Sequence, residues 1–405
     1  MSERLKEFEQ WGEDVIFGRA KGLRASLMRV FLRGLSWLFR GLVALRLNLF
    51  KRGWKEQAHL GTMVISIGNI TMGGTGKTPV VELFARTLRD RGRKVSILSR
   101  GYKSKPLDEP QEWRKRENNE LVGEEEMPKV VSCGQGVKLE VQYAGDEPYM
   151  LAKNLDNVSV VVDKDRVKGG KFAIQELGAD ILLLDDGMQF LKIAHSIDIV
   201  LVDSNSPFGT GAMMPRGTLR EPPRNLCRAD YIFITKCRKA HNDELIKKIK
   251  KHNKVAEIIE CTHGPVHLEN VFNGETKPLS FLKDKYIAAI SGIAVPESFE
   301  EKLTDLGANV LFHRTFSDHY SFSQSDIDRF MTRCMRRDAE IIVTTEKDAV
   351  RFPKPSEMDV DVYFLRIEVD ILSGADVWDK LVSRTCGERE PVDPLLIYER
   401  QRKFT

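Results

Sequence analysis

A short run of glycines, a lysine and a threonine is the part of the chain best suited to chemistry. Residues 73–78 read Gly-Gly-Thr-Gly-Lys-Thr, after a β-branched run at 63–67 and before apolar residues at helical spacing at 80–88. Strand, glycine loop, lysine and threonine, then helix, is the order of a phosphate-binding P-loop. The glycines let backbone N–H groups turn toward phosphate oxygens, and the helix N-terminus adds partial positive charge. This stretch therefore predicts binding of a nucleoside triphosphate.

Each residue of this loop has an expected role. Lys77 would reach the β- and γ-phosphates, and the Thr78 hydroxyl would ligate Mg²⁺. The nucleotide-binding residues that we predict are Gly73, Gly74, Thr75, Gly76, Lys77 and Thr78. Thr71 replaces the first glycine of the usual motif, and Pro79 follows directly, where a first helical turn tolerates proline. A glycine-rich turn without a ligand is the alternative, and a second motif argues against it.

That second motif is an apolar run that ends in two aspartates. Residues 179–187 read Ala-Asp-Ile-Leu-Leu-Leu-Asp-Asp-Gly, with Asp185 and Asp186 at the end of the run. Such a run is typical of a buried parallel strand, and α/β sheets bind ligands at the carboxyl ends of such strands. Either carboxylate is placed to hold Mg²⁺ or its water shell. Strands also end in aspartate at ordinary turns, so the prediction depends on the P-loop occurring in the same chain.

Phosphoryl transfer to an alcohol needs metal ligands and a base near the acceptor hydroxyl. Asp146 and Glu147 are adjacent acids ahead of a helical pattern, and they join the two aspartates above as candidate carboxylates. His319, which follows Asp318 in a loop, is the candidate base or orienter. Each has an ordinary alternative, because an acid pair before proline often starts a helix and an Asp-His pair often lies in a surface turn.

The elements that must position these residues alternate between strands and helices. Apolar runs predict strands near 63–67, 94–99, 130–132, 158–163, 181–186, 197–203 and 231–235, then near 286–291, 309–316, 340–345 and 361–367. This order predicts an α/β fold: a P-loop-type parallel sheet with flanking helices and a second, smaller α/β domain. We expect N-terminal amphipathic helices at 1–55, a P-loop core domain at 56–265, a second domain that closes over the active site at 266–385, and a tail at 386–405.

The segment at 23–50 has an apolar face and a basic face. Ser26, Arg29, Arg33, Ser36 and Arg40 recur at spacings of three and four, opposite a broad apolar face. Residues 15–55 hold ten basic residues and no acid, so the rest of this chain of net charge +4 is negative. The pattern favours a helix in the interface of an anionic membrane, and no uncharged run reaches the roughly 20 residues of a spanning helix. The alternative is an amphipathic helix packed on the core, with its arginines in solvent.

The composition excludes several other classes of protein. The chain has 405 residues, 41% hydrophobic and 30% charged, as in a soluble globular protein with a large core. Six scattered cysteines without a C-x-x-C pair argue against a zinc site or a disulfide framework, and no signal-peptide layout begins the chain. Arg238 stands where a GTPase has its guanine-reading aspartate, so ATP is the expected nucleotide. A basic arm without a matching basic domain argues against a nucleic-acid partner.

Taken in order, these motifs resemble the tetraacyldisaccharide 4′-kinase family, the lipid A 4′-kinases. The resemblance covers roughly residues 30–367, and it rests on 68–79, 99–102, 145–148, 165–166, 185–189, 207–222, 291–294, 318–319 and 345–348. The family also has threonine-type residues at the position of Thr71. The resemblance implies a kinase that uses ATP and Mg²⁺ to phosphorylate the 4′-hydroxyl of a tetraacylated glucosamine disaccharide 1-phosphate. It implies a peripheral protein at the cytoplasmic face of the bacterial inner membrane.

The resemblance also implies roles in pairs: Asp146 and His319 as a base dyad, Thr78 and Glu147 at Mg²⁺, Asp185 and Asp186 at the metal and phosphates, and Arg220 and Glu221 at the lipid headgroup. The family has a histidine where this chain has Phe190, so that side chain's role is absent here. We expect a monomer. The competing class is a P-loop ATPase that couples hydrolysis to a protein partner, such as a metallochaperone or assembly factor, and a binding-only module comes third. ATP turnover that depends on a lipid acceptor would separate the kinase from both.

Overall fold

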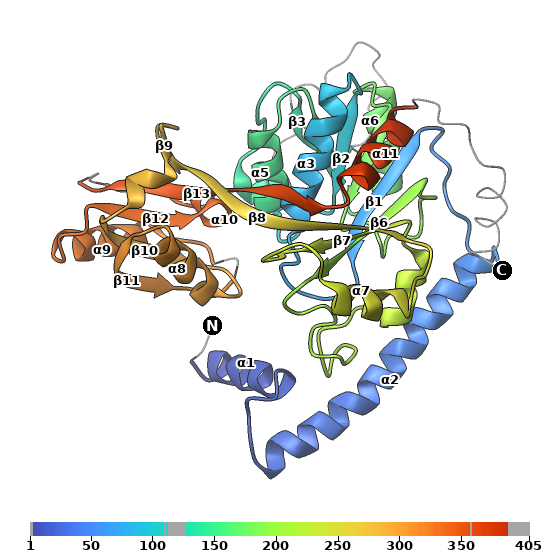
Figure 1. Cartoon of the computed structure of the whole chain (residues 1–405), viewed down its shortest axis with the longest axis horizontal. Helices are drawn as coiled ribbons and strands as arrows, with labels where there is room; N and C mark the ends of the chain where they lie inside the picture. Colours follow the sequence, from blue (N-terminus) through green and yellow to red (C-terminus); the bar gives the residue numbers. More distant parts are fainter. Residues whose placement is uncertain (1–2, 109–110, 112–126, 319, 357–358, 388–405) are drawn as a thin grey trace.

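The computed structural model describes residues 3–108, 111, 127–318, 320–356 and 359–387, which form one large, curled β-sheet with helices around it (Figure 1). Among these residues, thirteen strands belong to the sheet, in the order β11-β10-β12-β13-β8-β7-β6-β1-β5-β2-β4-β3, with β9 beside β8. Neighbouring strands are parallel except for β3 with β4, β13 with β8, and β9 with β8. The expected α/β fold with a mostly parallel sheet and flanking helices is confirmed.

The first group of strands is buried on both faces, as its apolar runs require. It consists of β1 (Met63–Asn69), β5 (Ile181–Asp185), β2 (Val95–Ser99), β4 (Ser159–Val162), β3 (Lys129–Cys133), β6 (Ile197–Asp203) and β7 (Tyr231–Thr235). β1 lies between β5 and β6, with Ile67 level with Asp185. The glycine loop after β1 and the aspartates that end β5 therefore leave the same edge of the sheet side by side.

Helices cover both faces of this first group. One face carries α3 (Lys77–Asp90), α5 (Asp146–Asn154), which follows the short α4 (Val141–Ala144), and α11 (Ala375–Cys386); the other carries α6 (Arg166–Gln175), η3 (Pro223–Arg228) and α7 (Asp243–Lys250). α11 is the last described helix, yet it returns to the first group of strands. The ring of its Trp378 lies 5.3 Å from that of Phe84 on α3 and 6.0 Å from that of Phe233 on β7.

A second, smaller group of strands continues the same sheet. β10 (Tyr286–Ser291), β11 (Asn309–Thr315) and β12 (Ile341–Thr345) join the first group through the long antiparallel pair β8 (Glu257–Asn270) and β13 (Asp361–Ser373), with β9 (Thr276–Pro278) at the end of β8. α8 (Pro296–Asp305) and η4 (Leu279–Leu282) cover one face, α9 (Gln324–Met335) covers the other, and α10 (Glu346–Ala349) follows β12. The boundary expected at residue 265 lies inside β8, and the division into two domains stays a prediction.

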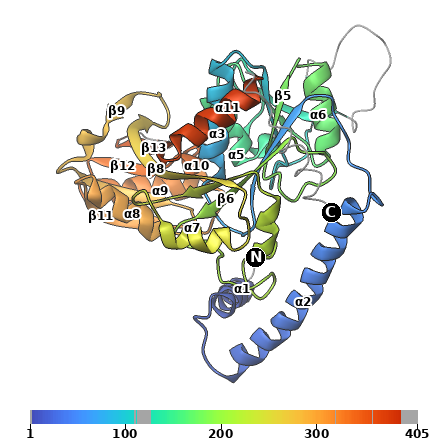
Figure 2. The ribbon, with the colours of Figure 1, turned by 45° about the vertical axis from the view of Figure 1, so that its right-hand side comes forward.

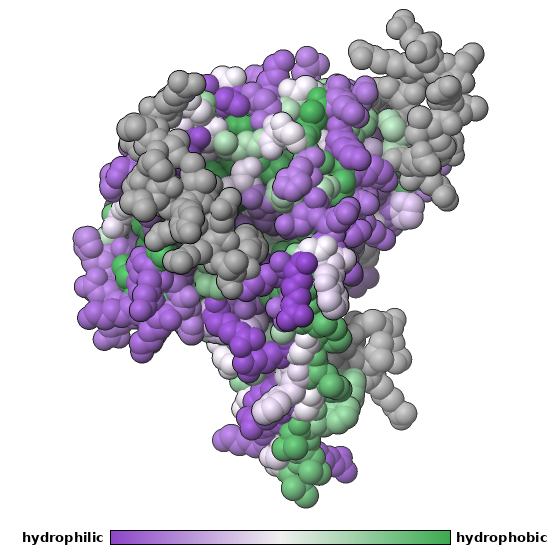
Figure 3. Space-filling view, turned by 90° about the vertical axis from the view of Figure 1, so that its right-hand side faces the viewer, coloured by the Kyte–Doolittle hydropathy of each residue, from purple (hydrophilic) through white to green (hydrophobic). Residues whose placement is uncertain are grey.

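At the N-terminal end, α1 (Glu3–Ile16) leads into α2 (Leu23–Lys51), a 29-residue helix that runs outward past the sheet (Figures 1 and 2). One side of α2 is anchored, because Ser36 Oγ accepts a 3.0 Å hydrogen bond from the Arg216 N–H and Arg46 donates a 2.9 Å bond to the Gln189 carbonyl. Elsewhere α2 exposes Leu23, Leu27, Val30, Phe31, Trp37, Leu38, Leu42 and Leu45. Figure 3 shows hydrophobic side chains along its free part. Across the described residues, no helix has the length and apolar character needed to cross a membrane.

Candidate active site

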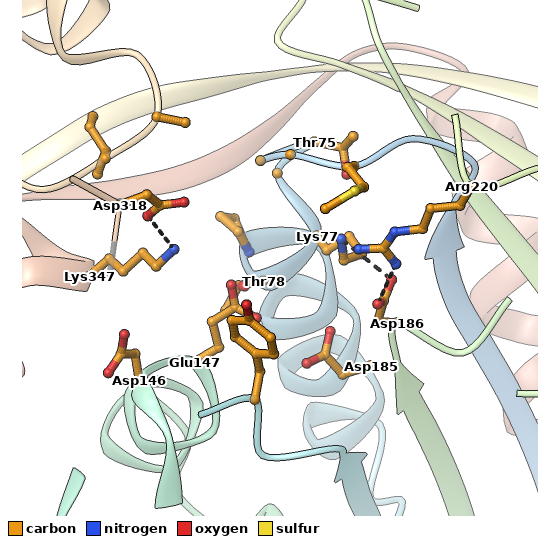
Figure 4. Close-up of a pocket in the computed structure, with 18 of the residues that line it drawn as sticks. Thr75, Lys77, Thr78, Asp146, Glu147, Asp185, Asp186, Arg220, Asp318 and Lys347 are labelled. Carbon is orange, nitrogen blue, oxygen red and sulfur yellow. Dashed lines mark hydrogen bonds and ion pairs between the residues drawn. The ribbon is translucent and has the colours of Figure 1, made fainter. Parts of the chain in front are cut away.

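The P-loop connects the end of β1 to the first turn of α3 (Figure 4). Gly73 and Gly76 have φ angles of 109° and 78°, in the left-handed region that residues with a side chain rarely adopt. Gly76 has a second reason to be glycine, because a Cβ there would lie 1.9 Å from Cε1 of His263 on β8. From β7, the Thr235 hydroxyl donates a 2.8 Å hydrogen bond to the Thr75 carbonyl. Contacts from two other strands, β7 and β8, therefore hold the loop in place.

All six predicted P-loop residues line one large cavity of about 1810 Å³. Its wall also includes the ends of β2 and β5, the first turn of α5, one side of α2, and residues of β8, α8 and α10. The predicted site residues Asp146, Glu147, Asp185, Asp186, Arg220 and Glu221 lie in this wall. The structure thus brings together every predicted site residue that it describes, and His319 lies outside the described residues.

Lys77 points toward the aspartate that follows β5 (Figure 4). Its Nζ lies 3.5 Å from Oδ1 of Asp186 and donates a 3.4 Å hydrogen bond to Oδ1 of Asn69. Asn69 in turn donates a 3.0 Å hydrogen bond to Oγ1 of Thr75. With 13% of its side chain exposed, Lys77 presents its charge beside the loop, where phosphate oxygens are expected.

Asp186 lies between two cations. It follows the end of β5 with a left-handed φ of 54°, and its carboxylate faces Lys77 and Arg220. Arg220 Nη1 donates a 2.6 Å hydrogen bond to Oδ2. Burial acts to raise the pKa of Asp186, but the charges of Lys77 and Arg220 outweigh burial and hold this pKa below its ordinary value. Asp186 is therefore a carboxylate at neutral pH.

Asp185 has a different electrostatic environment. It is 3% exposed, and its Oδ2 accepts a 3.2 Å hydrogen bond from the Ser99 hydroxyl. Its Oδ1 is buried and has no hydrogen-bond partner among the described residues. Burial, and then the nearby charges of Glu147 and Asp186, raise the pKa of Asp185 to about 6. A buried carboxylate with an unsatisfied oxygen at a cavity wall is suited to a bound cation.

The side chains around Asp185 fit a magnesium ion. Thr78, Glu147 and Asp185 supply only oxygen ligands, and they lie near one another at the wall of the cavity (Figure 4). Among the described residues, no group of three or more His, Cys, Asp or Glu side chains is arranged to hold a metal ion. Magnesium in phosphoryl-transfer sites is usually bound by one or two carboxylates together with phosphates and water, and Glu147 and Asp185 are two carboxylates at this wall.

Asp146 and Glu147 form the first turn of α5, just after Gly145 with its φ of 90°. They are helix-start residues, and they also reach the cavity. Glu147 lies near Thr78, whereas Asp146 lies toward the second group of strands (Figure 4), where Arg351 Nε is 3.6 Å from its Oδ2. In that second group, Asp318 pairs with Lys347 at 3.2 Å. The dyad of Asp146 with His319 stays a prediction.

Glu221 lies beside Arg220 but has a different environment. It is 3% exposed, and its carboxylate accepts hydrogen bonds of 2.7 Å from Arg228, 2.7 Å from Asn225 and 3.0 Å from Gln189. These bonds fix the end of the long loop at 206–222, so that Arg220 is held against Asp186. A direct contact of Glu221 with a lipid headgroup stays a prediction.

Arg166 lines the cavity, but no role for it is predicted from the sequence. It begins α6, is 4% exposed, donates a 3.1 Å hydrogen bond to the Asp186 carbonyl and lies 5.4 Å from the ring centre of Phe190. The family resemblance includes Asp165-Arg166 among its motifs, so the sequence marks the position of Arg166 but does not indicate its function. His263 and Lys302, whose Nζ donates a 2.8 Å hydrogen bond to the His263 carbonyl, also line the cavity. Single residues of these types give no signal in a sequence.

The fold and the site define a P-loop protein that binds nucleoside phosphates. Residues 28–386 match the family described as tetraacyldisaccharide-1-P 4′-kinase, and the chain belongs to this family. Tetraacyldisaccharide 4′-kinase of Anaeromyxobacter dehalogenans is 36% identical over 84% of this chain and 86% of the relative, and that of Halothermothrix orenii is 32% identical over 92% and 97%. The crystal structure of LpxK from Aquifex aeolicus in complex with ATP has a TM-score of 0.68 and 28% identity, covering 88% of this chain and 99% of that one.

Proposed function

We propose that this protein transfers the γ-phosphoryl group of ATP to the 4′-hydroxyl of a tetraacylated glucosamine disaccharide 1-phosphate. The observation that carries the proposal is the make-up of one cavity wall, which joins the phosphate-binding Lys77 and Thr78 to the apolar side chains of Phe39, Leu42 and Val43 on α2. A phosphoryl donor and an acylated acceptor therefore have adjoining surfaces. The particular acceptor is taken from the name of the family and of the relatives above.

The described residues can contribute to transfer mainly through position and charge, which are the usual sources of catalysis for phosphoryl groups. Lys77 and Arg220 bring two positive charges to the cavity on either side of Asp186. When bound, Mg²⁺ would neutralise phosphate charge, and Thr78 and Glu147, with Asp185 and Asp186, are the residues that would hold it.

The base is proposed to be Asp146 together with His319. Asp146 is at the cavity wall, and its carboxylate lies on the side of the second group of strands (Figure 4). A carboxylate paired with an imidazole orients it and raises its basicity, which suits removal of a proton from a sugar hydroxyl near neutral pH. Arg220 is proposed to face the acceptor headgroup, with Glu221 fixing its position.

The place of action is proposed to be the cytoplasmic face of the bacterial inner membrane, with α2 lying in the interface. The support is the row of exposed apolar residues on α2 and the basic character of the segment at 15–55. The same helix contributes to the wall of the cavity, so an acceptor held in the membrane would have a short path to the P-loop. The protein is proposed to act as a monomer.

The proposed reaction is tested by transfer of radiolabel from [γ-³²P]ATP to tetraacyldisaccharide 1-phosphate in mixed micelles. The fully deacylated disaccharide 1-phosphate is the matched control acceptor. We expect a labelled product from the acylated acceptor and far less product from the deacylated acceptor. The deacylated acceptor has no acyl chains for the apolar part of the cavity wall to bind. ATP hydrolysis at the same rate with and without the lipid, and no labelled lipid, would instead support an ATPase that serves a protein partner.

A further inference from the structure

Arg351 contacts both sides of the candidate active site. It follows α10, and only 6% of its side chain is exposed. On one side, its Nε lies 3.6 Å from Oδ2 of Asp146 at the start of α5. On the other side, its Nη1 donates a 2.7 Å hydrogen bond to the carbonyl of Tyr320, the residue next to His319 in the chain. One guanidinium thus touches the proposed base and the backbone of the loop that carries the proposed imidazole.

The guanidinium of Arg351 is fixed by a third partner, Asp348. This carboxylate is fully buried and pairs with Nη2 of Arg351. Its other oxygen accepts a 2.9 Å hydrogen bond from the Gly292 N–H and a 2.6 Å bond from the Thr345 hydroxyl. Because Asp348 itself is held by two donors, it sets the direction of the arginine, whose Nε donates a 3.4 Å hydrogen bond to the Lys347 carbonyl and lies 3.6 Å from Oδ2 of Asp146.

The contact between Arg351 and Asp146 is of a different kind. A separation of 3.6 Å is too long for a hydrogen bond, so the carboxylate of Asp146 is attracted by the charge without being bonded to it. Such a contact sets the direction of the carboxylate through charge, and general-base catalysis depends on the direction of the base.

A second buried arginine makes a useful comparison. Arg366 is also buried and joins the two groups of strands, because it pairs with Glu82 on α3 and with Glu346 on α10. Its ion pairs with α3 and α10 do not involve Asp146. Loss of either arginine leaves buried carboxylates without their cation, which destabilises a fold. Only the loss of Arg351 also removes a contact of the proposed base.

We propose that Arg351 is a positioning residue for phosphoryl transfer: it orients the carboxylate of Asp146 and holds the backbone of Tyr320 through its carbonyl. The proposal rests on the proposed function, because that function gives Asp146 the role of base. Arg351 acts through Asp146 and Tyr320, and it is not among the described residues that line the cavity. Asp146 and Arg351 should therefore behave as a coupled pair, whereas Asp146 and Arg366 should not.

The test is a pair of double-variant cycles in the full-length protein. Arg351→Gln and, as matched control, Arg366→Gln are each combined with Asp146→Asn. kcat and KM are measured for both substrates, together with the affinity for a fluorescent ATP analogue. We expect Arg351→Gln to lower kcat by roughly 10- to 100-fold, the scale of a misplaced catalytic group, with analogue affinity nearly unchanged. Arg351→Lys should restore part of kcat, and Arg351→Gln should add little to the loss in Asp146→Asn.

The factors by which Arg366→Gln and Asp146→Asn each lower kcat should multiply in the double variant, because the ion pairs of Arg366 with α3 and α10 do not involve Asp146. Multiplied losses for Arg351→Gln and Asp146→Asn would overturn the proposal, and so would a normal kcat in Arg351→Gln. If Arg351→Gln fails to fold, the variant that carries Asp348→Asn as well removes the uncompensated buried charge and is used in the same cycle. An Asp146→Asn enzyme with a normal kcat would overturn both the base assignment and this proposal. Failure of the proposed function is seen separately, as an unvaried protein that labels no lipid acceptor.

Discussion

Nη1 of Arg220 lies 2.6 Å from Oδ2 of Asp186, on the carboxylate whose other oxygen is 3.5 Å from Nζ of Lys77. This contact ties the loop at 206–222 to the P-loop through one aspartate. Phosphate groups bound at the P-loop would bring negative charge to the same two cations. Nucleotide binding and the position of the long loop are therefore expected to be linked through Asp186.

We expect Arg220→Gln to weaken this link. A hydrogen bond to a charged group contributes about 1.5–3 kcal/mol, so kcat/KM for the lipid should fall by roughly 10- to 100-fold. KM for the lipid should rise more than KM for ATP, because Lys77 remains at the P-loop. Arg220→Lys keeps the positive charge but lacks the forked guanidinium group. Its kcat/KM should lie between those of the unvaried protein and Arg220→Gln. Steady-state kinetics with each substrate varied in turn provides the check, and an equal rise in both KM values would argue against a role on the acceptor side.

Lys77→Ala should abolish transfer while the fold stays intact. The lysine supplies charge to the transferring phosphoryl group, and loss of one such donor costs a factor of about 10² to 10³ in kcat. Lys171→Ala, an exposed lysine on α6, is the matched control and should behave like the unvaried protein. Label transfer and circular dichroism are measured on the same samples. Full turnover by Lys77→Ala would exclude the P-loop assignment.

Exposed residues of α2 should control binding to membranes. Phe31, Trp37 and Leu38 are 62%, 76% and 67% exposed, and each apolar side chain that enters the acyl boundary contributes about 1.5–3 kcal/mol when it is fully buried. Changing all three to serine should reduce co-sedimentation with anionic vesicles by at least about tenfold. Serine at the exposed Val255 and Tyr286, away from α2, is the control.

The arginines of α2 should add a salt-dependent part to this binding. Arg33 and Arg40 are exposed, and each is worth about 1 kcal/mol at an anionic surface, so their change to glutamate should weaken binding at low salt most strongly. Arg29 is left out because it donates hydrogen bonds to the Ala20 and Ala25 carbonyls. If neither the apolar nor the arginine variants alter vesicle binding, α2 serves the protein fold alone.

His263 should make the stability of the fold depend on pH. Burial, and then the charges of Lys236 and Lys302, lower its pKa to about 4 from an ordinary value of 6.5. The unfolded chain therefore binds a proton between pH 6.5 and 4 while the folded protein does not, so the free energy of unfolding falls as the pH is lowered through this range. The effect is at most about 3 kcal/mol. Urea unfolding at pH 7 and pH 5 gives the free energy of unfolding at each pH. Between these pH values it should fall less in His263→Gln than in the unvaried protein. An equal fall in both proteins would disprove the role of His263.

Asp146 and His319 should act as one unit. Asp146→Ala and His319→Ala are each expected to lower kcat strongly with little change in nucleotide affinity, since neither belongs to the P-loop. The double variant should be scarcely slower than the slower single variant, because residues that act together are not additive on removal. If the losses of kcat in the single variants multiply in the double variant, the two residues act independently. A nearly normal kcat in His319→Ala would show that His319 belongs to an ordinary surface turn without a catalytic role.

The order of elements and the main part of the site could be predicted from the sequence because the signals are local. The glycines of the P-loop, the apolar run that ends in Asp185, and the alternation of strands and helices each occupy one short stretch. A shared sheet edge then brings Lys77 and Asp186 together, since parallel strands end on the same side. Periodicity also predicts a helix at 23–50, where the structure has α2, and the place of this helix in a membrane interface stays a prediction.

The contacts that were missed join residues far apart in the chain. Nothing near Gly76 in the sequence points to His263, and the need for glycine there comes from packing between a loop and a distant strand. Arg351 reaches Asp146 only because β8 and β13 bring the second group of strands to α5. The apolar runs predict no strand at 257–270 and only the first part of β13, at 361–367, since half-buried stretches lack a clear period. Such features depend on tertiary structure, which local patterns do not encode.

The return of α11 to the first group of strands has a consequence for how the chain is made. Trp378 completes a cluster with Phe84 and Phe233, and Leu381 and Val382 are buried in the same core. During synthesis, the first group of strands leaves the ribosome early, but this part of its core is supplied only after residue 375. Domains usually fold as soon as they emerge. Here the nucleotide-binding group of strands must wait for α11, so apolar surface on α3 and β7 stays open to chaperones until residues 375–386 have been made.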